Sequence, residues 1–231
     1  MRLSIIIPVY NEINTIETII NKILNVKINN KEIIIVDDFS KDGTREKLLS
    51  LKQNKELNII FHDRNMGKGA CIKSATKYLN GDYVVIQDAD LEYDPNDLLK
   101  FLDFVEKKGA KVVYGSRVLG RKKLNFNFFV IFRIFANFFL TKISNLINNQ
   151  KLTDAHTCYK FISKNIFLNL DLKQDDFSIC PEITTKISKL KIDIFEIPIS
   201  YNGRNYSQGK KIKFKDGIMA LVTLIKYRFF T

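Results

Sequence analysis

The chain has 231 residues, of which 45% are hydrophobic and 12% aromatic, so it is long enough for one domain with a substantial core and too apolar to be disordered. Its formal net charge of +12 calls for an acidic partner, such as phosphorylated substrates, an anionic membrane surface or nucleic acid. Only eight of the 37 basic residues are arginine, the preferred reader of bases and phosphate backbones, which argues against nucleic acid.

The first 118 residues alternate between short β-branched runs and segments of helical periodicity. Strands are expected at residues 3–9, 32–37, 57–62, 82–87 and 111–115. Isoleucines at three- and four-residue steps after residue 13 predict an amphipathic helix, and similar helices fit residues 42–53, 68–79 and 95–108. This alternation predicts an α/β fold with a mainly parallel sheet and helices on both faces.

The fourth expected strand runs into four carboxylates, Asp88, Asp90, Glu92 and Asp94. In an extended chain, alternate side chains share a face, which would place Asp88, Asp90 and Glu92 on one side. Oxygen ligands converging from one edge suit a hard divalent cation, Mg²⁺ or Mn²⁺. The alternative is a solvated turn, with Asp94-Pro95 beginning the next helix.

Polar residues follow all five expected strands, and in open α/β sheets ligands bind outside the carboxyl ends of the strands. These residues are Asn11 and Glu12, Asp37 and Asp38, Asp63 and Arg64, the acidic run itself, and Ser116 and Arg117. Because several independent polar clusters are expected to meet at one edge, a functional site is favoured over a solvated turn.

The alternation stops after residue 118. Residues 124–149 hold seven phenylalanines between positions 126 and 139, with Arg133 and Asn137 on one helical face. The apolar stretch is shorter than the ~20 residues that cross a bilayer, so we expect an amphipathic helix lying in the membrane interface. A core helix or a dimer-interface helix is the alternative.

The last third contains an expected strand at residues 194–201 and a closing amphipathic helix at 215–230. Seven basic residues and one acidic residue lie between Arg204 and Arg228. Gly203 and Gly209 bracket the start of this run, a pattern typical of a mobile loop that faces phosphate. A solvated basic tail is the alternative.

Read together, the motifs resemble the family 2 glycosyltransferases of GT-A (Rossmann-like) fold, and within them the dolichol-phosphate mannose synthase-like, or polyprenyl-phosphate glycosyltransferase, branch. The motifs are "IIIPVYNE" at 5–12, "IVDDFSKDGT" at 35–44, "NMGKGA" at 65–70, "QDADLEYDP" at 87–95, "YGSR" at 114–117, "TDAHTCYK" at 153–160, "PEIT" at 181–184 and "EIPISYNGRNYSQGKKI" at 196–212. Residues 178–180, Ser-Ile-Cys, depart from the family's pattern, and the sequence does not include the C-terminal membrane spans that many relatives carry.

The resemblance implies one GT-A domain in two halves, with residues 1–118 binding the nucleotide sugar and residues 119–231 binding the acceptor and the membrane interface. It assigns the nucleotide sugar to Pro8, Tyr10, Glu12, Asp37, Asp38, Lys68 and Asp88. It assigns the metal, Mg²⁺ or Mn²⁺, to Asp88, Asp90 and Glu92. It assigns the acceptor phosphate to Arg117, Arg133, Arg204, Lys210 and Lys211, and catalysis to Asp90, Arg117 and Arg204.

The implied function is an inverting, metal-dependent transfer of a hexose from a nucleotide sugar, of GDP-mannose or UDP-glucose type, to a polyprenyl (dolichyl or undecaprenyl) phosphate. The alternatives are a family 2 enzyme that uses a sugar hydroxyl or another lipid, for which Asp154 or Glu182 would have to serve as base, and a non-catalytic nucleotide-binding scaffold.

Three cysteines without a CxxC pair fit a reduced compartment and no zinc site. Together with this, the resemblance implies a peripheral protein on the cytoplasmic face of an anionic membrane, without nucleic acid as partner. A homo-oligomer and a separate membrane-embedded partner protein are both left open.

Overall fold

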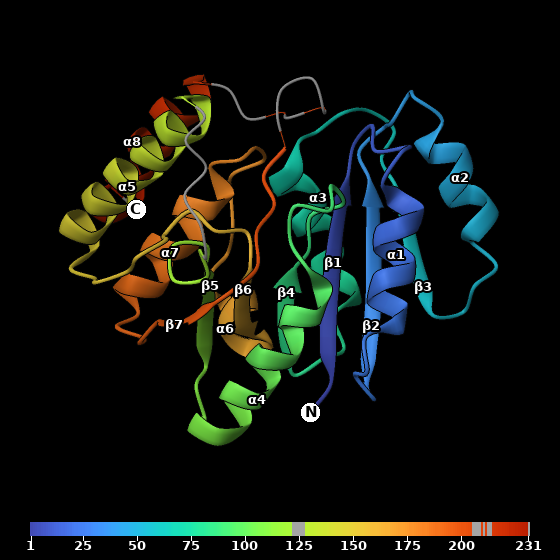
Figure 1. Ribbon diagram of the computed structural model, residues 1–231, viewed down its shortest axis with the longest axis horizontal. Helices are drawn as coiled ribbons and strands as arrows, with labels where there is room; N and C mark the ends of the chain where they lie inside the picture. The colour runs from blue at the N-terminus through green and yellow to red at the C-terminus, as the bar shows by residue number, and fades with distance from the viewer. Residues whose placement is uncertain (122–127, 205–208, 210, 212–213, 231) are drawn as a thin grey trace.

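The computed structural model describes residues 1–121, 128–204, 209, 211 and 214–230, and of residues 128–133 and 214 it describes the backbone only. Its centre is a seven-stranded sheet in the order β3-β2-β1-β4-β6-β5-β7 (Figure 1). The strands are β1 Leu3–Val9, β2 Lys31–Asp37, β3 Leu57–Phe61, β4 Tyr83–Ile86, β5 Val112–Ser116, β6 Lys160–Ser163 and β7 Phe195–Pro198. Within this sheet β6 alone runs antiparallel to its neighbours, which confirms the mainly parallel sheet.

Helices surround the sheet and bury its apolar strands. Consecutive residues of β1 and β2 are buried, which requires cover on both faces because neighbouring side chains point to opposite sides. The α-helices are α1 Ile16–Asn25, α2 Thr44–Leu51, α3 Lys68–Ala75, α4 Leu98–Lys108, α5 Phe128–Asn148, α6 Lys164–Asn169, α7 Ile179–Lys189 and α8 Phe214–Phe229. Two short 3₁₀ turns, η1 Thr76–Tyr78 and η2 Pro95–Asp97, follow α3 and precede α4.

Strand β6 joins the two halves of the chain into one sheet. It lies between β4 and β5, although it follows both of them in sequence. Because β6 is antiparallel, the residues that precede it lie at the edge where β4 and β5 end. The segment 153–159 therefore reaches the same edge as the acidic run, a placement that the sequence periodicity did not predict.

Helices α5 and α8 lie side by side at one end of the molecule, and both contact α7 (Figure 1). The side chains on the inner face of α5 are polar, because Thr141, Ser144 and Asn148 are at most 3% exposed. Its outer face is apolar, since Phe135 and Leu146 are 65% and 84% exposed. The polarity of this helix is thus the reverse of an ordinary surface helix.

The outer face of α8 is also apolar, and it adds to the surface formed by α5. Ile218, Val222, Ile225 and Phe229 are each at least 46% exposed. In the described part of the chain, no helix combines the length and the hydrophobicity needed to cross a membrane.

Candidate functional site

A cavity of about 530 Å³ opens at the carboxyl edge of the sheet. It is lined by residues 11–15, Asp42, Asp90, Leu91, residues 202–204 and Gly209. The loop after β1, the acidic run after β4 and the segment after β7 therefore share one hollow, as the sequence predicted for the first two.

The acidic run forms a turn, which corrects the extended geometry expected from the sequence. Strand β4 ends at Ile86, and Leu91 has a left-handed backbone with φ of 61°. The nitrogen of Glu92 donates to Oδ1 of Asp90 at 3.1 Å and closes the turn. The carboxylates reach the edge because the chain turns there, and not because alternate residues of a strand share a face.

Asp88 is paired with Lys68 from the start of α3. The ammonium group of Lys68 contacts Oδ1 of Asp88, and the thiol of Cys158 lies 3.1 Å from the same oxygen. Burial alone would lower the pKa of Lys68, but the Asp88 carboxylate, together with Cys158 and Cys180, holds this pKa above its usual range. A fixed positive charge therefore accompanies Asp88 at the edge of the sheet.

Asp90 and Glu92 share one cationic partner, Arg204. Nη2 of Arg204 lies 2.9 Å from Oδ2 of Asp90, and its backbone nitrogen donates to Glu92 at 2.6 Å. The hydroxyl of Tyr201 donates to the other oxygen of Glu92 at 2.6 Å. Burial raises the pKa of Asp90 to about 7, the carboxylates of Asp88 and Glu92 add to the shift, and Arg204 opposes it. The site therefore carries more negative charge than it can easily hold without a cation.

The carboxylates of this run are the type of donor that suits a hard divalent cation, although their oxygens are not gathered within 4.8 Å of one another in the described part of the chain. Carboxylate oxygens of Asp88, Asp90 and Glu92 are the ligands that Mg²⁺ and Mn²⁺ prefer. Lys68 and Arg204 offset part of the charge of these three carboxylates. The fit rests on this excess of carboxylate at an open edge.

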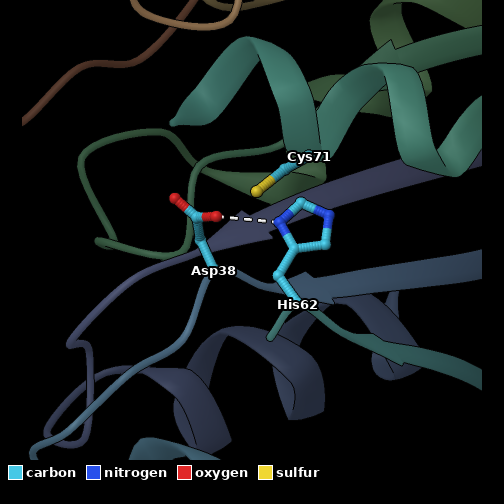
Figure 2. Close-up of side chains that lie close together, drawn as sticks. All are labelled: Asp38, His62 and Cys71. Carbon is cyan, nitrogen blue, oxygen red and sulfur yellow. Dashed lines mark hydrogen bonds and ion pairs between the residues drawn. The ribbon is translucent and has the colours of Figure 1, made fainter. Parts of the chain in front are cut away.

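A second cluster, formed by Asp38, His62 and Cys71, brings three ligand atoms within 4.8 Å of one another, the only such group among the described residues (Figure 2). Nδ1 of His62 lies 2.8 Å from Asp38, and its Nε2 lies 2.9 Å from the hydroxyl of Ser74. Burial raises the pKa of the Cys71 thiol, which favours the protonated form over the thiolate that a metal needs. Both ring nitrogens already have partners, so the cluster is better suited to hold neighbouring segments together than to bind a metal.

Asp38 holds the loop that precedes α3. Its two carboxylate oxygens accept from the backbone nitrogens of Met66 and Gly67 at 2.8 and 2.7 Å. Asp38 is only 2% exposed. The resemblance assigned this residue to the nucleotide sugar, and the contacts described here position the loop that carries Lys68.

The "GKG" segment, residues 67–69, packs against another loop. The nitrogen of Ala70 donates to the carbonyl oxygen of Asp175 at 3.0 Å. A Cβ atom at Gly69 would lie 2.3 Å from the carbonyl oxygen of Gln174, so only glycine permits this approach. Gly67 has φ of 98°, a left-handed backbone that also favours glycine. These glycines allow close packing and leave Lys68 to face Asp88.

Two basic side chains from the C-terminal part of the chain contact the Glu12 carboxylate. Both terminal nitrogens of Arg204 lie 3.0 Å from the Glu12 carboxylate, and the ammonium group of Lys211 contacts the same carboxylate. Lys211 also donates to the carbonyl oxygen of Tyr10. Residues assigned to donor and acceptor are therefore directly paired across the cavity.

Two parallel hydrogen bonds join Arg117 to Asp154. Nε and Nη2 of Arg117 donate to the two oxygens of Asp154 at 2.6 and 2.7 Å. Burial would raise the pKa of Asp154, but Arg117 outweighs it and holds this pKa below its usual range. Glu196 accepts from the backbone nitrogens of Thr153 and Asp154 at 2.7 and 3.0 Å and so fixes the loop.

The other predicted site residues differ in their burial, and some lie outside the described part of the chain. Asp37 is fully buried and lies 3.7 Å from Arg45, whereas Pro8 and Tyr10 are partly exposed at the end of β1. Lys210 and the side chain of Arg133 lie outside the described residues.

Sequence reasoning did not predict the contacts of several residues at this edge. Asp154 and Tyr201 lie in motifs that the resemblance includes, but no local pattern shows that they contact Arg117 and Glu92. His156 is partly buried, and the loss of hydration lowers its pKa to about 4, so it is neutral near pH 7. Cys158 and Glu196 also lie in the quoted motifs, which do not show that they contact Asp88 and the backbone of the Asp154 loop.

Comparison with known proteins gives a consistent set of relatives. The family model of glycosyl transferase family 2 matches residues 4–170. A dolichol-phosphate mannosyltransferase of Pyrococcus furiosus is 28% identical over 212 residues, covering 91% of this chain and 59% of the relative. A UDP-N-acetylglucosamine--dolichyl-phosphate N-acetylglucosaminyltransferase of Methanococcus voltae is 30% identical and covers 89% of this chain and 88% of the relative. The chain thus spans less than two thirds of the first relative's length.

A solved structure shares the fold. Glucosyl-3-phosphoglycerate synthase from Mycobacterium tuberculosis, in complex with Mn²⁺, uridine diphosphate and glucosyl-3-phosphoglycerate, superposes with a TM-score of 0.71 at 16% identity. The match covers 98% of this chain and 80% of that one. The likeness confirms the GT-A-like fold.

Proposed function

The chain belongs to glycosyl transferase family 2, and we propose that it transfers a hexose from a nucleotide sugar to a polyprenyl phosphate. The predicted resemblance is confirmed by the family model, and the relatives named above act, by their names, on dolichyl phosphate. For this chain the donor, the acceptor, the metal and the stereochemistry are part of the proposal.

The observation that carries the proposal is the pairing of opposite charges across the cavity. Asp90 and Glu12 line the cavity, and Arg204 bridges them from the segment after β7. A nucleotide sugar with its metal would take up the carboxylates, and a lipid phosphate would take up the basic side chains. A site for two anionic substrates needs both groups.

The chemistry needs little proton transfer. A phosphomonoester has a second pKa of about 6, so near neutral pH its oxygen is already a nucleophile. That oxygen attacks the anomeric carbon while the bond to the nucleoside diphosphate breaks, and this single displacement inverts the configuration. The chain's residues align the two substrates and neutralise their charge.

The contacts of two buried carboxylates favour a phosphate acceptor over a hydroxyl acceptor. A hydroxyl acceptor would need a base, for which the sequence offered Asp154 or Glu182. Asp154 is paired with Arg117, while Glu182 is fully buried and accepts from the nitrogens of Lys173 and Gln174 at 2.8 Å. Both carboxylates are engaged in structural contacts.

Asp90 and Glu92, with Asp88 beside them, would hold the divalent cation. When bound, Mg²⁺ or Mn²⁺ would stabilise the charge that develops on the leaving diphosphate. Lys68 stays beside Asp88, and Arg204 can exchange its carboxylate contacts for substrate phosphate.

The outer surface of α5 and α8 supports a place at a membrane. A helix with a polar inner face and exposed phenylalanines is stable where an apolar phase covers it. The net charge of +12 fits an anionic surface. In this proposal the protein is peripheral on the cytoplasmic face, where the lipid phosphate enters beside α5.

Transfer should depend on Asp90. Incubation with Mg²⁺ or Mn²⁺, a panel of nucleotide sugars and undecaprenyl phosphate should yield a glycolipid, and Asp90→Asn should cut turnover by at least ~10²-fold, because it removes a charged ligand. Asp94→Asn is the matched control, since Asp94 lies in the same run but accepts from the nitrogen of Asn96 as a helix cap, which asparagine also does. Full activity of Asp90→Asn in EDTA would refute the metal assignment, and absence of product with every donor would refute the function.

A further inference from the structure

Asn137 on α5 contacts both members of the Arg117–Asp154 pair. Its carbonyl oxygen accepts from Nη2 of Arg117 at 3.2 Å, and its amide nitrogen donates to Oδ1 of Asp154 at 3.2 Å. An amide can give and accept hydrogen bonds in one plane, so it can contact a cation and an anion at once. Neither contact is an ion pair, and both distances lie at the long end of the usual range.

The loop that carries Asp154 is hydrogen-bonded to the same face of α5. Asn145 exchanges two hydrogen bonds with the backbone of Leu152, at 2.8 and 3.0 Å. One turn closer to Asn137, the hydroxyl of Thr141 accepts from the nitrogen of Ala155 at 3.3 Å. The inner face of α5 therefore supports the loop along its length, and Asn137 is the member that also contacts Arg117.

The other side of Arg117 is closed by an aromatic ring. The guanidinium group lies 5.1 Å from the ring centre of Tyr201, which in turn donates to Glu92. Asp154 holds one edge of the guanidinium, Tyr201 covers its face, and Asn137 contacts Nη2. Because Asn137 belongs to α5, the orientation of the Arg117 guanidinium group depends on the position of that helix.

We propose that Asn137 is a positioning residue that fixes the guanidinium of Arg117 relative to α5, and so aims it at an acceptor phosphate arriving beside that helix. The proposal rests on the proposed function for its acceptor. An apolar residue would keep the helix but remove both contacts. An aspartate would repel Asp154, so it is not a conservative replacement.

Kinetics separate a positioning role from a structural one. We expect Asn137→Leu to raise the acceptor KM or lower kcat by about 10-fold in total, the effect of losing a hydrogen bond to a charged group, with donor affinity unchanged. Thr141→Val is the matched control, since it removes a bond from the same helix face without touching Arg117, and its effect should be several-fold smaller. Asn137→Ala serves as a second variant if the leucine variant does not fold.

A double-mutant cycle tests whether Asn137 acts through Arg117. In an Arg117→Ala background, Asn137→Leu should have little further effect on transfer, whereas equal losses in both backgrounds would overturn the proposal. The Nη2–Hη2 signal of Arg117 in ¹⁵N NMR spectra, from the group that donates to Asn137, gives a second readout that requires no activity. It should be protected from exchange in the wild type and lose protection in Asn137→Leu, and unchanged protection would also overturn the proposal. If the wild type forms no glycolipid, the proposed function fails, and the NMR result still decides the role of Asn137.

Discussion

At the scale of single residues, the clearest departure from ordinary behaviour is a buried lysine below the site. Lys160 is 1% exposed, donates to the carbonyl oxygen of Ala155 at 2.8 Å and lies 3.9 Å from the ring centre of Tyr114. Burial lowers its pKa from 10.5 to about 8. Lys160 thus holds the loop of Asp154 through its hydrogen bond to Ala155. The burial of its positive charge, in turn, destabilises the folded state.

The stability of the protein should reveal this buried charge between pH 7 and pH 10. Above pH 8 the folded protein releases the Lys160 proton while the unfolded chain still binds it up to pH 10.5, so the Lys160 contribution to the free energy of unfolding rises with pH. Relative to Lys160→Met, the wild type should gain roughly 1–3 kcal/mol between pH 7 and pH 10. Urea unfolding of both proteins at the two pH values measures this. The same difference at both values would show that Lys160 is not responsible.

At the scale of secondary-structure elements, α5 and α8 stand apart from the helices that cover the sheet. Both expose apolar side chains, and α5 turns its polar residues inward to Asp154 and the loop around it. The expected membrane-interface helix and the alternative of a dimer interface both explain an exposed apolar surface, whereas a core helix does not, because Phe138 and Phe139 are 55% and 53% exposed.

A charge placed on this surface should release the protein from membranes without unfolding it. We expect Phe139→Glu on α5 and Ile225→Glu on α8 to weaken binding to anionic liposomes strongly, since each puts a carboxylate where lipid chains and anionic head groups would lie. Leu49→Glu is the matched control, because Leu49 is 50% exposed on α2 at the other end of the molecule. Liposome sedimentation measures binding, circular dichroism checks folding, and light scattering checks size. Unchanged liposome binding with a change from dimer to monomer would favour a dimer interface instead.

At the scale of the whole molecule, the two halves of the chain are joined at the site by ion pairs. Arg204 reaches Glu12 across 192 residues, and Lys211 reaches it across 199. Glu12 and Arg204 line the cavity, so a substrate that binds there would compete with the contact between them. In the proposed function, the basic segment would therefore contact the donor as well as the acceptor.

Arg204→Lys should impair transfer by about 10-fold or more, although it keeps the charge. A lysine cannot form the two parallel bonds that Arg204 makes with Glu12, or bind a phosphate in the same forked manner. Acceptor KM and kcat, with nucleotide affinity measured by calorimetry, locate the loss. Lys215→Ala is the matched control, since Lys215 belongs to the same basic run but is exposed on α8. Unchanged kinetics with the lipid phosphate would contradict a role for Arg204 and favour an uncharged acceptor.

The strands, the helices and the polar edge were predictable from the sequence because they depend on local patterns. Buried runs of isoleucine and valine predict parallel strands, and polar residues after them predict the carboxyl edge. The acidic run and the basic segment were recognisable for the same reason, as dense clusters of one charge. The paired roles of Arg204 and Glu12 were not, because the two residues are far apart in the sequence.

Tertiary structure decided which of these residues meet. The insertion of β6 between β4 and β5 brings Asp154 to Arg117 and Cys158 to Asp88, and antiparallel pairing at such separation leaves no periodic signal. The left-handed turn at Leu91 replaced the extended acidic strand, since a strand cannot be told from a turn by charge spacing alone. Tertiary structure also buries Asp38, which contacts the backbone nitrogen of Gly67 and the ring of His62. A buried carboxylate is stable only where it has such hydrogen-bond partners, and the sequence does not show which residues supply them.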